Sequence, residues 1–275
     1  MIEKFLRDGW VIVDIKDTPT IYKIIKRLNA PLPCALSELH LNYDDTAIKK
    51  QHVALSELFW DNEFSLKISD AMLPIMQQLL GLDVMVQYLP YLRIARPNCP
   101  QDNIGYHKDT QYGQTPYELA VHIPFVDLDE KSAIRVISGS HLMPESAFVG
   151  VTPEGSRIEK GSIENHMGRP YMPKCLAVPE GMETTPLCVK VGQAAIFSPA
   201  IFHGQEVNAG DITRVSCDLR FVNSRAPIEI RKGKVHAGYV PVSQSPVEIV
   251  ADKYYGANAA TPADIANIAL KILGE

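Results

Sequence analysis

The sequence lacks a cysteine pattern that would imply a disulfide framework or a zinc ribbon. Its five cysteines are scattered and include no C-x-x-C pair, which favours a reducing compartment, so we expect a cytoplasmic protein. Basic residues are also few, with 27 Lys and Arg against 32 Asp and Glu and a formal net charge of −5. This balance argues against nucleic acid or an anionic membrane as the main partner.

Other features are missing as well. No apolar run approaches the roughly 20 residues that span a bilayer, and the amino-terminal stretch MIEKFLRDGWVIVDIKD carries charges where a secretory signal needs an apolar segment. Neither a G-x-G-x-x-G motif nor another phosphate-binding loop is present, so a nucleotide-binding core is not expected. The remaining composition, 46% hydrophobic and 21% charged over 275 residues, predicts a soluble globular protein that can bury a sizeable core. The oligomeric state is left open.

Residues 1–82 are expected to be mostly helical after one short strand. The β-branched stretch GWVIVDI predicts that strand. The first helix should begin where Asp17 or Thr18 caps it and Pro19 occupies its first turn. Apolar residues then recur at helical spacing in two further segments. Three helices are therefore predicted, over residues 17–28, 44–60 and 64–81.

From residue 83 onwards the sequence changes to short β-type runs separated by Gly, Pro, Asn and Asp. Strands at this spacing predict a sandwich or barrel over residues 83–225. Within this core, residues 142–186 are rich in Pro, Gly and charge and are expected to form a lid or binding loop. Residues 226–275 form a mixed tail, where TPADIANIALKILGE predicts a terminal helix. We expect residues 1–275 to be one domain.

A His-x-Asp pair, His107 and Asp109, lies in the stretch GYHKDTQYG. In a strand, residues two apart face the same way, so both side chains can approach one metal ion. Further along, His203 interrupts the apolar stretch AIFSPAIFHG, an unfavourable place for an imidazole without a partner. If the chain reverses at NAGD, a hairpin places Arg214 opposite His203, with Ser216 on the same face. The pattern predicts that these side chains converge.

Two histidines and one carboxylate, with coordination positions left open, form the ligand set of non-haem iron(II) oxygenases. The single carboxylate leaves one net positive charge, which attracts an anionic chelating co-substrate. A buried arginine pairs with the far carboxylate of such a co-substrate through its planar fork, and a serine hydroxyl adds a hydrogen bond. The alternative is a core histidine satisfied by a backbone carbonyl, beside an unrelated surface pair.

This arrangement, H-x-D followed by a distal histidine and then R-x-S, resembles the iron(II)/2-oxoglutarate-dependent oxygenases. The stretches FLRDGWVIV, IPFVDLDEKSAIRVISGSHL and VGQAAIFSPAIFHG are similar to the phytanoyl-CoA dioxygenase-like family, with Ser132 and Ser138 where that family commonly has glycine and proline. The resemblance implies a mainly β fold with N-terminal helices and a double-stranded β-helix (jelly roll, cupin-like) core. It also implies metal ligands at His107, Asp109 and His203, and co-substrate ligands at Arg214 and Ser216.

The resemblance further implies an enzyme that uses Fe(II), 2-oxoglutarate and O2, releases succinate and CO2, and hydroxylates an unactivated C–H bond. Desaturation, ring closure and epimerisation stay open. Asp109 favours hydroxylation over halogenation, because halogenating relatives replace this carboxylate with a small residue. Polar groups in residues 142–186 favour a small polar metabolite, such as a carbohydrate or secondary-metabolite precursor, over a long acyl chain.

Other classes remain as alternatives. The first is a cupin-like isomerase or dioxygenase that does not use 2-oxoglutarate. A non-catalytic binding protein on the same barrel is a second, and a zinc hydrolase is a third, although the sequence contains no H-E-x-x-H motif.

Several further residues are weighed for the pocket. Arg93 and Arg96 precede the His-x-Asp turn, and their role is left open. His122 alternates with apolar neighbours and therefore faces away from them. The candidates for lining the substrate pocket are Tyr106, Gln111, Tyr112, His122 and Arg135. The histidines in polar or helical contexts are expected to be solvated: His40, His52, His166 and His236.

Overall fold

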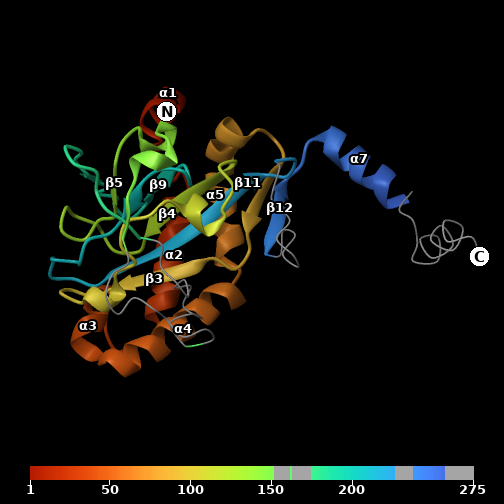
Figure 1. The fold of residues 1–275 in the computed structure, drawn as a ribbon. Helices are drawn as coiled ribbons and strands as arrows, with labels where there is room; N and C mark the ends of the chain where they lie inside the picture. The colour runs from red at the N-terminus through yellow and green to blue at the C-terminus, as the bar shows by residue number, and fades with distance from the viewer. Residues whose placement is uncertain (152–161, 163–174, 227–237, 258–275) are drawn as a thin grey trace, which may run out of the picture.

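The computed structural model describes residues 1–151, 162, 175–226 and 238–257. Its largest sheet is built from β1 (Trp10–Asp14), β2 (Val84–Gln87), β3 (Tyr91–Ala95), β4 (Glu118–Pro124), β9 (Gln193–Phe197), β11 (Arg214–Asn223) and β12 (Tyr239–Ser243). The order is β1-β9-β4-β11-β2-β12, with β3 also paired to β11, and every pairing is antiparallel. Figure 1 shows β11 crossing the middle of the molecule between β4 and β3.

A second, smaller sheet packs against the large one. Its strands are β10 (His203–Gly204), β5 (Arg135–Val136) and β8 (Thr185–Pro186), and a separate pair is formed by β6 (Gly150–Val151) and β7 (Cys175–Leu176). Val136 of β5 belongs to the same buried apolar cluster as Ala120, Ala195 and Phe197 of the large sheet. Two antiparallel sheets that share an apolar core form the double-stranded β-helix, so the predicted fold class is confirmed.

Helices occupy most of the amino-terminal part, as predicted. They are α1 (Ile2–Asp8), α2 (Thr18–Asn29), α3 (Leu39–Asn42), α4 (Asp45–Asp61) and α5 (Phe64–Leu80), and α7 (Pro246–Ala257) follows β12. The Asp17 side chain accepts a hydrogen bond from the backbone N–H of Thr20 and caps α2, and Asp44 caps α4 in the same way. The sequence predicted neither α1, which ends at the left-handed Gly9, nor α7.

Helices α2, α4 and α5 cover one face of the large sheet. Their apolar side chains share one buried cluster with Val215, Cys217, Leu219 and Phe221 of β11. Side chains alternate along a strand, so the residues that alternate with these four face the second sheet. Those residues are Arg214, Ser216, Asp218 and Arg220. One strand therefore presents apolar groups to the helices and polar groups to the space between the sheets.

Within the described residues, no helix is long and apolar enough to cross a membrane. Two predictions concern segments outside them. The middle of the predicted lid at residues 142–186 falls in 152–161 and 163–174, and the predicted terminal helix falls in 258–275.

Candidate metal centre

His107 and His203 lie directly opposite each other in an isolated antiparallel bridge. The backbone N–H of His107 donates to the carbonyl of His203 at 2.7 Å, and the N–H of His203 donates to the carbonyl of His107 at 2.9 Å. The two imidazole ring centroids are 4.4 Å apart. Backbone pairing thus holds the two side chains on one patch, although they are far apart in the sequence.

Both imidazole rings have their Nδ1 atoms bound to backbone carbonyls. Nδ1 of His107 is 3.0 Å from the carbonyl of Gly105, and Nδ1 of His203 is 3.0 Å from the carbonyl of Ile201. A carbonyl oxygen only accepts, so each Nδ1 carries the proton. In the neutral form of each ring, Nε2 is then unprotonated and available to a metal ion.

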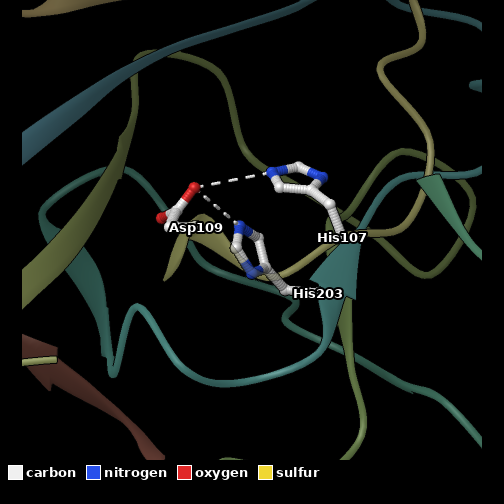
Figure 2. A group of neighbouring side chains, drawn as sticks. All are labelled: His107, Asp109 and His203. Carbon is white, nitrogen blue, oxygen red and sulfur yellow. Dashed lines mark ion pairs between the residues drawn. The ribbon is translucent and has the colours of Figure 1, made fainter. Parts of the chain in front are cut away.

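Asp109 completes the group. Its Oδ1 lies 3.5 Å from Nε2 of His107 and 3.8 Å from Nε2 of His203, and Figure 2 shows both rings turned toward this oxygen. One ligand atom from each of the three residues lies within 4.8 Å of the others. The expectation that His107 and Asp109 share a strand is wrong, because His107 forms only an isolated bridge outside the named strands. Asp109 begins a 3₁₀ turn (Asp109–Tyr112) that directs its carboxylate back toward the histidines.

The protonation states of these groups suit a divalent cation. Burial raises the pKa of the Asp109 carboxyl, but the nearby charges of Arg220 and the two histidines lower it well below its usual range. Burial lowers the pKa of His203 to about 4. At neutral pH the site therefore offers an ionised carboxylate and a neutral imidazole, the forms that bind metal. This donor set fits iron(II).

Arg220 is a functional residue that the sequence reasoning missed. Its Nη1 donates to Oδ2 of Asp109 at 2.5 Å, so this oxygen is engaged and Oδ1 is directed at the histidines. Both side chains are largely buried, with 15% and 7% of their areas exposed. The signal was present, because Arg220 continues the alternation that starts at Arg214 and Ser216.

Arg214 and Ser216 do lie in the barrel, but the predicted hairpin is wrong. Arg214 pairs with Ala95 of β3, and β10, which carries His203, pairs with β5 in the other sheet. The turn after β10 crosses from one sheet to the other, since the Asn208 side chain donates to the carbonyls of Ala95 and Ile212. Arg214 and His203 therefore face each other across the cavity.

The Arg214 guanidinium is 3% exposed and lacks an acidic partner within hydrogen-bond distance among the described residues. Its Nη1 donates to the carbonyl of Ser132 at 3.3 Å, whereas its Nε and the Oγ of Ser216 have no hydrogen-bond partner there. Burial lowers the pKa of Arg214 to about 10, so the group stays charged at neutral pH. A buried cation beside an unpaired hydroxyl suits a carboxylate ligand.

The cavity between the sheets is lined by the candidate metal-binding group (His107, Asp109 and His203) and by Arg214. Of the predicted pocket residues, His122 lines it and is hydrogen bonded to Asp218. The expectation that His52 is solvated is wrong, because α4 packs on β3 and buries it, with Nε2 2.8 Å from the carbonyl of Leu92. The cavity is lined by polar side chains that include His52, Arg93, Asp102, His107, Asp109, His122, His203, Gln205, Arg214, Asp218 and Arg220.

The other predicted pocket residues lie outside this lining. The Tyr106 hydroxyl donates to Glu206, and the Arg135 guanidinium donates to Thr184. Tyr112 packs edge-on against the His107 ring, and the Gln111 side chain accepts a hydrogen bond from the backbone N–H of Lys108. These four side chains support the walls of the site.

Gly204 keeps the two histidine segments in contact. A Cβ on Gly204 would come within 2.5 Å of the carbonyl oxygen of Gly105 and 2.6 Å of Cα of Tyr106. Because these are backbone atoms, Gly204→Ala must move β10 away from the His107 segment. We expect it to weaken Mn(II) binding by about tenfold or more, measured by calorimetry. Gly150→Ala, where a Cβ meets nothing within 4 Å, is the matched control. Unchanged affinity in Gly204→Ala would show that this approach is not needed.

The chain was compared with known proteins. A family model for phytanoyl-CoA dioxygenase matches residues 36–216. Among solved structures, the apo form of the non-heme monooxygenase ThoJ is similar at a TM-score of 0.55 and 16% identity, covering 88% of this chain and 83% of that chain. The ThoJ–Ni complex gives 0.54 and 16% identity at the same coverage. No curated protein sequence matches the chain significantly.

A double-stranded β-helix that encloses two histidines and a carboxylate is the architecture of the non-haem iron oxygenases. The match to the family model over residues 36–216 identifies the family within this class. The chain belongs to the phytanoyl-CoA dioxygenase family, and it is an iron- and 2-oxoglutarate-dependent enzyme.

Proposed function

We propose that this enzyme hydroxylates an unactivated C–H bond of a small polar metabolite. In the balanced reaction, substrate, 2-oxoglutarate and O2 give hydroxylated substrate, succinate and CO2. The observation that carries the proposal is the pairing of two incomplete sites in one cavity. One is the His107–Asp109–His203 group, and the other is Arg214, whose Nε has no hydrogen-bond partner among the described residues. The same holds for the Ser216 hydroxyl, two positions further along β11.

Each of these groups has a defined task in the proposal. His107, Asp109 and His203 hold iron(II) through two neutral nitrogens and one carboxylate oxygen. Arg214 and Ser216 hold the distal carboxylate of 2-oxoglutarate by charge-assisted hydrogen bonds. When bound, iron and 2-oxoglutarate activate O2 so that a C–H bond of the substrate can be oxidised.

The protein supplies orientation and exclusion of water. Arg220 fixes the Asp109 carboxylate, and the histidine bridge fixes both imidazoles, so the metal ligands need no rearrangement when the ion binds. The ThoJ–Ni complex, in which a structurally similar protein holds a divalent metal, supports a metal site in this fold.

The cavity itself supports a polar substrate. Its lining includes Arg93, Asp102, His122 and Gln205 in addition to the metal-binding group. A long acyl chain would bury these polar and charged groups against hydrocarbon, whereas the hydroxyl or amine groups of a small metabolite can form hydrogen bonds with them. We propose that residues 1–275 act as one catalytic domain around this cavity.

Thermal melts test the proposal. The apo-protein is melted with Mn(II), which replaces oxygen-sensitive iron, with and without 2-oxoglutarate. A ligand that binds only the folded state adds about 2.7 kcal/mol at one hundred times its dissociation constant. We expect 2-oxoglutarate to stabilise the protein only when the metal is present, and iron(II) with O2 to form succinate. If the metal stabilises the protein and 2-oxoglutarate does not, the cupin-like alternative replaces the proposal.

A further inference from the structure

A cluster in the cavity belongs neither to the metal-binding group nor to the Arg214–Ser216 anchor. Asp218 accepts a hydrogen bond from Nδ1 of His122 on one oxygen and from Nε of Arg93 on the other, each at 2.9 Å. His122 is 1% exposed, and its Nε2 has no hydrogen-bond partner among the residues that the structure describes. All three residues line the cavity. A buried ring nitrogen is costly without a partner, so this atom points to a ligand.

The cluster fixes the proton on one side of the ring. Burial raises the pKa of the Asp218 carboxyl, but the hydrogen bond from His122 and the charge of Arg93 lower it well below its usual range. Ionised Asp218 only accepts hydrogen bonds, so Nδ1 of His122 carries a proton. A carboxylate ligand at Nε2 would accept a hydrogen bond from Nε2–H, and Asp218 would balance the charge of a ring that carries both protons.

The cluster lies along β11 between the Arg214–Ser216 anchor and the metal-binding group. The inward-facing residues of this strand succeed one another at steps of about 7 Å. Ser216, whose hydroxyl has no hydrogen-bond partner among the described residues, marks the anchor end, and Arg220 marks the metal end through its contact with Asp109. Asp218 lies one step from each, and the register of β4 places His122 directly opposite it.

2-Oxoglutarate has a five-carbon chain with a carboxylate at each end. Held at Ser216 by its distal carboxylate, it extends about one strand step toward the metal. Its 2-oxo-acid end then lies at the level of Asp218. The negative charge of Asp218 would repel a carboxylate there, but the His122 ring and the Arg93 guanidinium engage both of its oxygens.

We propose that His122 is a second binding group for 2-oxoglutarate and that its Nε2 binds the carboxylate at the 2-oxo-acid end. Asp218 and Arg93 are positioning residues that fix the orientation of the ring. The proposal rests on the proposed function, because it requires 2-oxoglutarate in this cavity. It adds a contact at the opposite end of the co-substrate from the one that Arg214 and Ser216 hold.

Two ligands and a matched pair of variants test the proposal. Calorimetry on the Mn(II)-loaded protein compares 2-oxoglutarate with 2-oxobutyrate, which has the same 2-oxo-acid end but no distal carboxylate. The amide nitrogen of His122→Asn can replace Nδ1 and keep the bond to Asp218 while Nε2 is lost. The longer side chain of His122→Gln can instead place an amide nitrogen near the position of Nε2.

We expect His122→Asn to raise the dissociation constant of both ligands by the same factor, about tenfold or more. His122→Gln should recover part of this loss, and both variants should bind Mn(II) alone with the affinity of the parent. Asp218→Asn leaves Nε2 in place but removes the balancing charge, so a smaller loss shared by both ligands is expected. Melts without ligand verify that each variant folds.

Two results would overturn the assignment of His122. Dissociation constants within twofold of the parent in His122→Asn would show that Nε2 does not contact the co-substrate. A loss confined to 2-oxoglutarate would place His122 at the distal carboxylate instead. By contrast, a parent protein that binds Mn(II) but not 2-oxoglutarate contradicts the proposed function, and this proposal with it.

Discussion

Asp109→Ala is expected to abolish Mn(II) binding and, separately, to destabilise the metal-free protein. The first effect follows from the loss of the only carboxylate in the His107–Asp109–His203 group. The second follows because Arg220 keeps its charge in a largely buried position without its partner. Removing one member of a buried ion pair costs about 3–5 kcal/mol. Calorimetry with Mn(II) and denaturant unfolding of the apo-protein measure the two effects.

A double variant separates these effects. Asp109→Ala combined with Arg220→Met removes both charges, so we expect it to regain most of the lost stability and still not bind Mn(II). Asp70→Ala, at an exposed position of α5, serves as the control and should change neither quantity. Retention of parental Mn(II) affinity by Asp109→Ala would refute the proposed role of Asp109 as a metal ligand.

Arg214→Met is expected to change two properties in opposite directions. It should abolish most 2-oxoglutarate binding, by about a hundredfold or more, because a buried charged contact to the distal carboxylate is lost. It should also stabilise the ligand-free protein by about 1–3 kcal/mol, because Arg214 is buried and the described residues place no acidic partner at hydrogen-bond distance from it. Calorimetry on the Mn(II)-loaded protein and apo-protein melts give the two values.

The chemistry of the ligand supplies a further control. 2-Oxobutyrate has no distal carboxylate, so its affinity should be the same in Arg214→Met and in the parent. Arg7→Met, at an exposed position of α1, should leave both ligands and the stability unaffected. If Arg214→Met instead bound 2-oxoglutarate as the parent does, the anchor would have to lie elsewhere in the cavity.

Local patterns in the sequence were sufficient to predict the fold class and much of the site. Capping residues such as Asp17, together with apolar residues at helical spacing, locate helices within a few residues, so α2, α4 and α5 could be placed from the sequence. The H-x-D spacing, His203 and Arg214 identified side chains that the structure brings together in one cavity. These predictions succeeded because each depends on residues close together in the chain.

The incorrect predictions concern contacts that are determined by packing between segments far apart in the sequence. The segment between His203 and Arg214 is short enough for a hairpin, yet it joins strands of facing sheets, and no local pattern distinguishes these two connections. His52 lies in a polar helical stretch and is buried only because α4 packs on β3. Likewise, the alternation along β11 could be read from the sequence, but the contact between Arg220 and Asp109 could not.

The alternation along β11 also limits how this region can change. Along β11, apolar groups face one side, and two arginines and an aspartate face the other. The strand therefore cannot gain or lose a residue without changing which side chains face the cavity. Inserting or deleting a single position would turn the charged groups into the helix-facing core and the apolar groups into the cavity. Substitutions at one position can be compensated by neighbours, but a shift in length would remove the anchor, the His122 support and the Arg220 contact at once. We therefore expect the number of residues between Arg214 and Arg220 to be the least variable length in the whole protein.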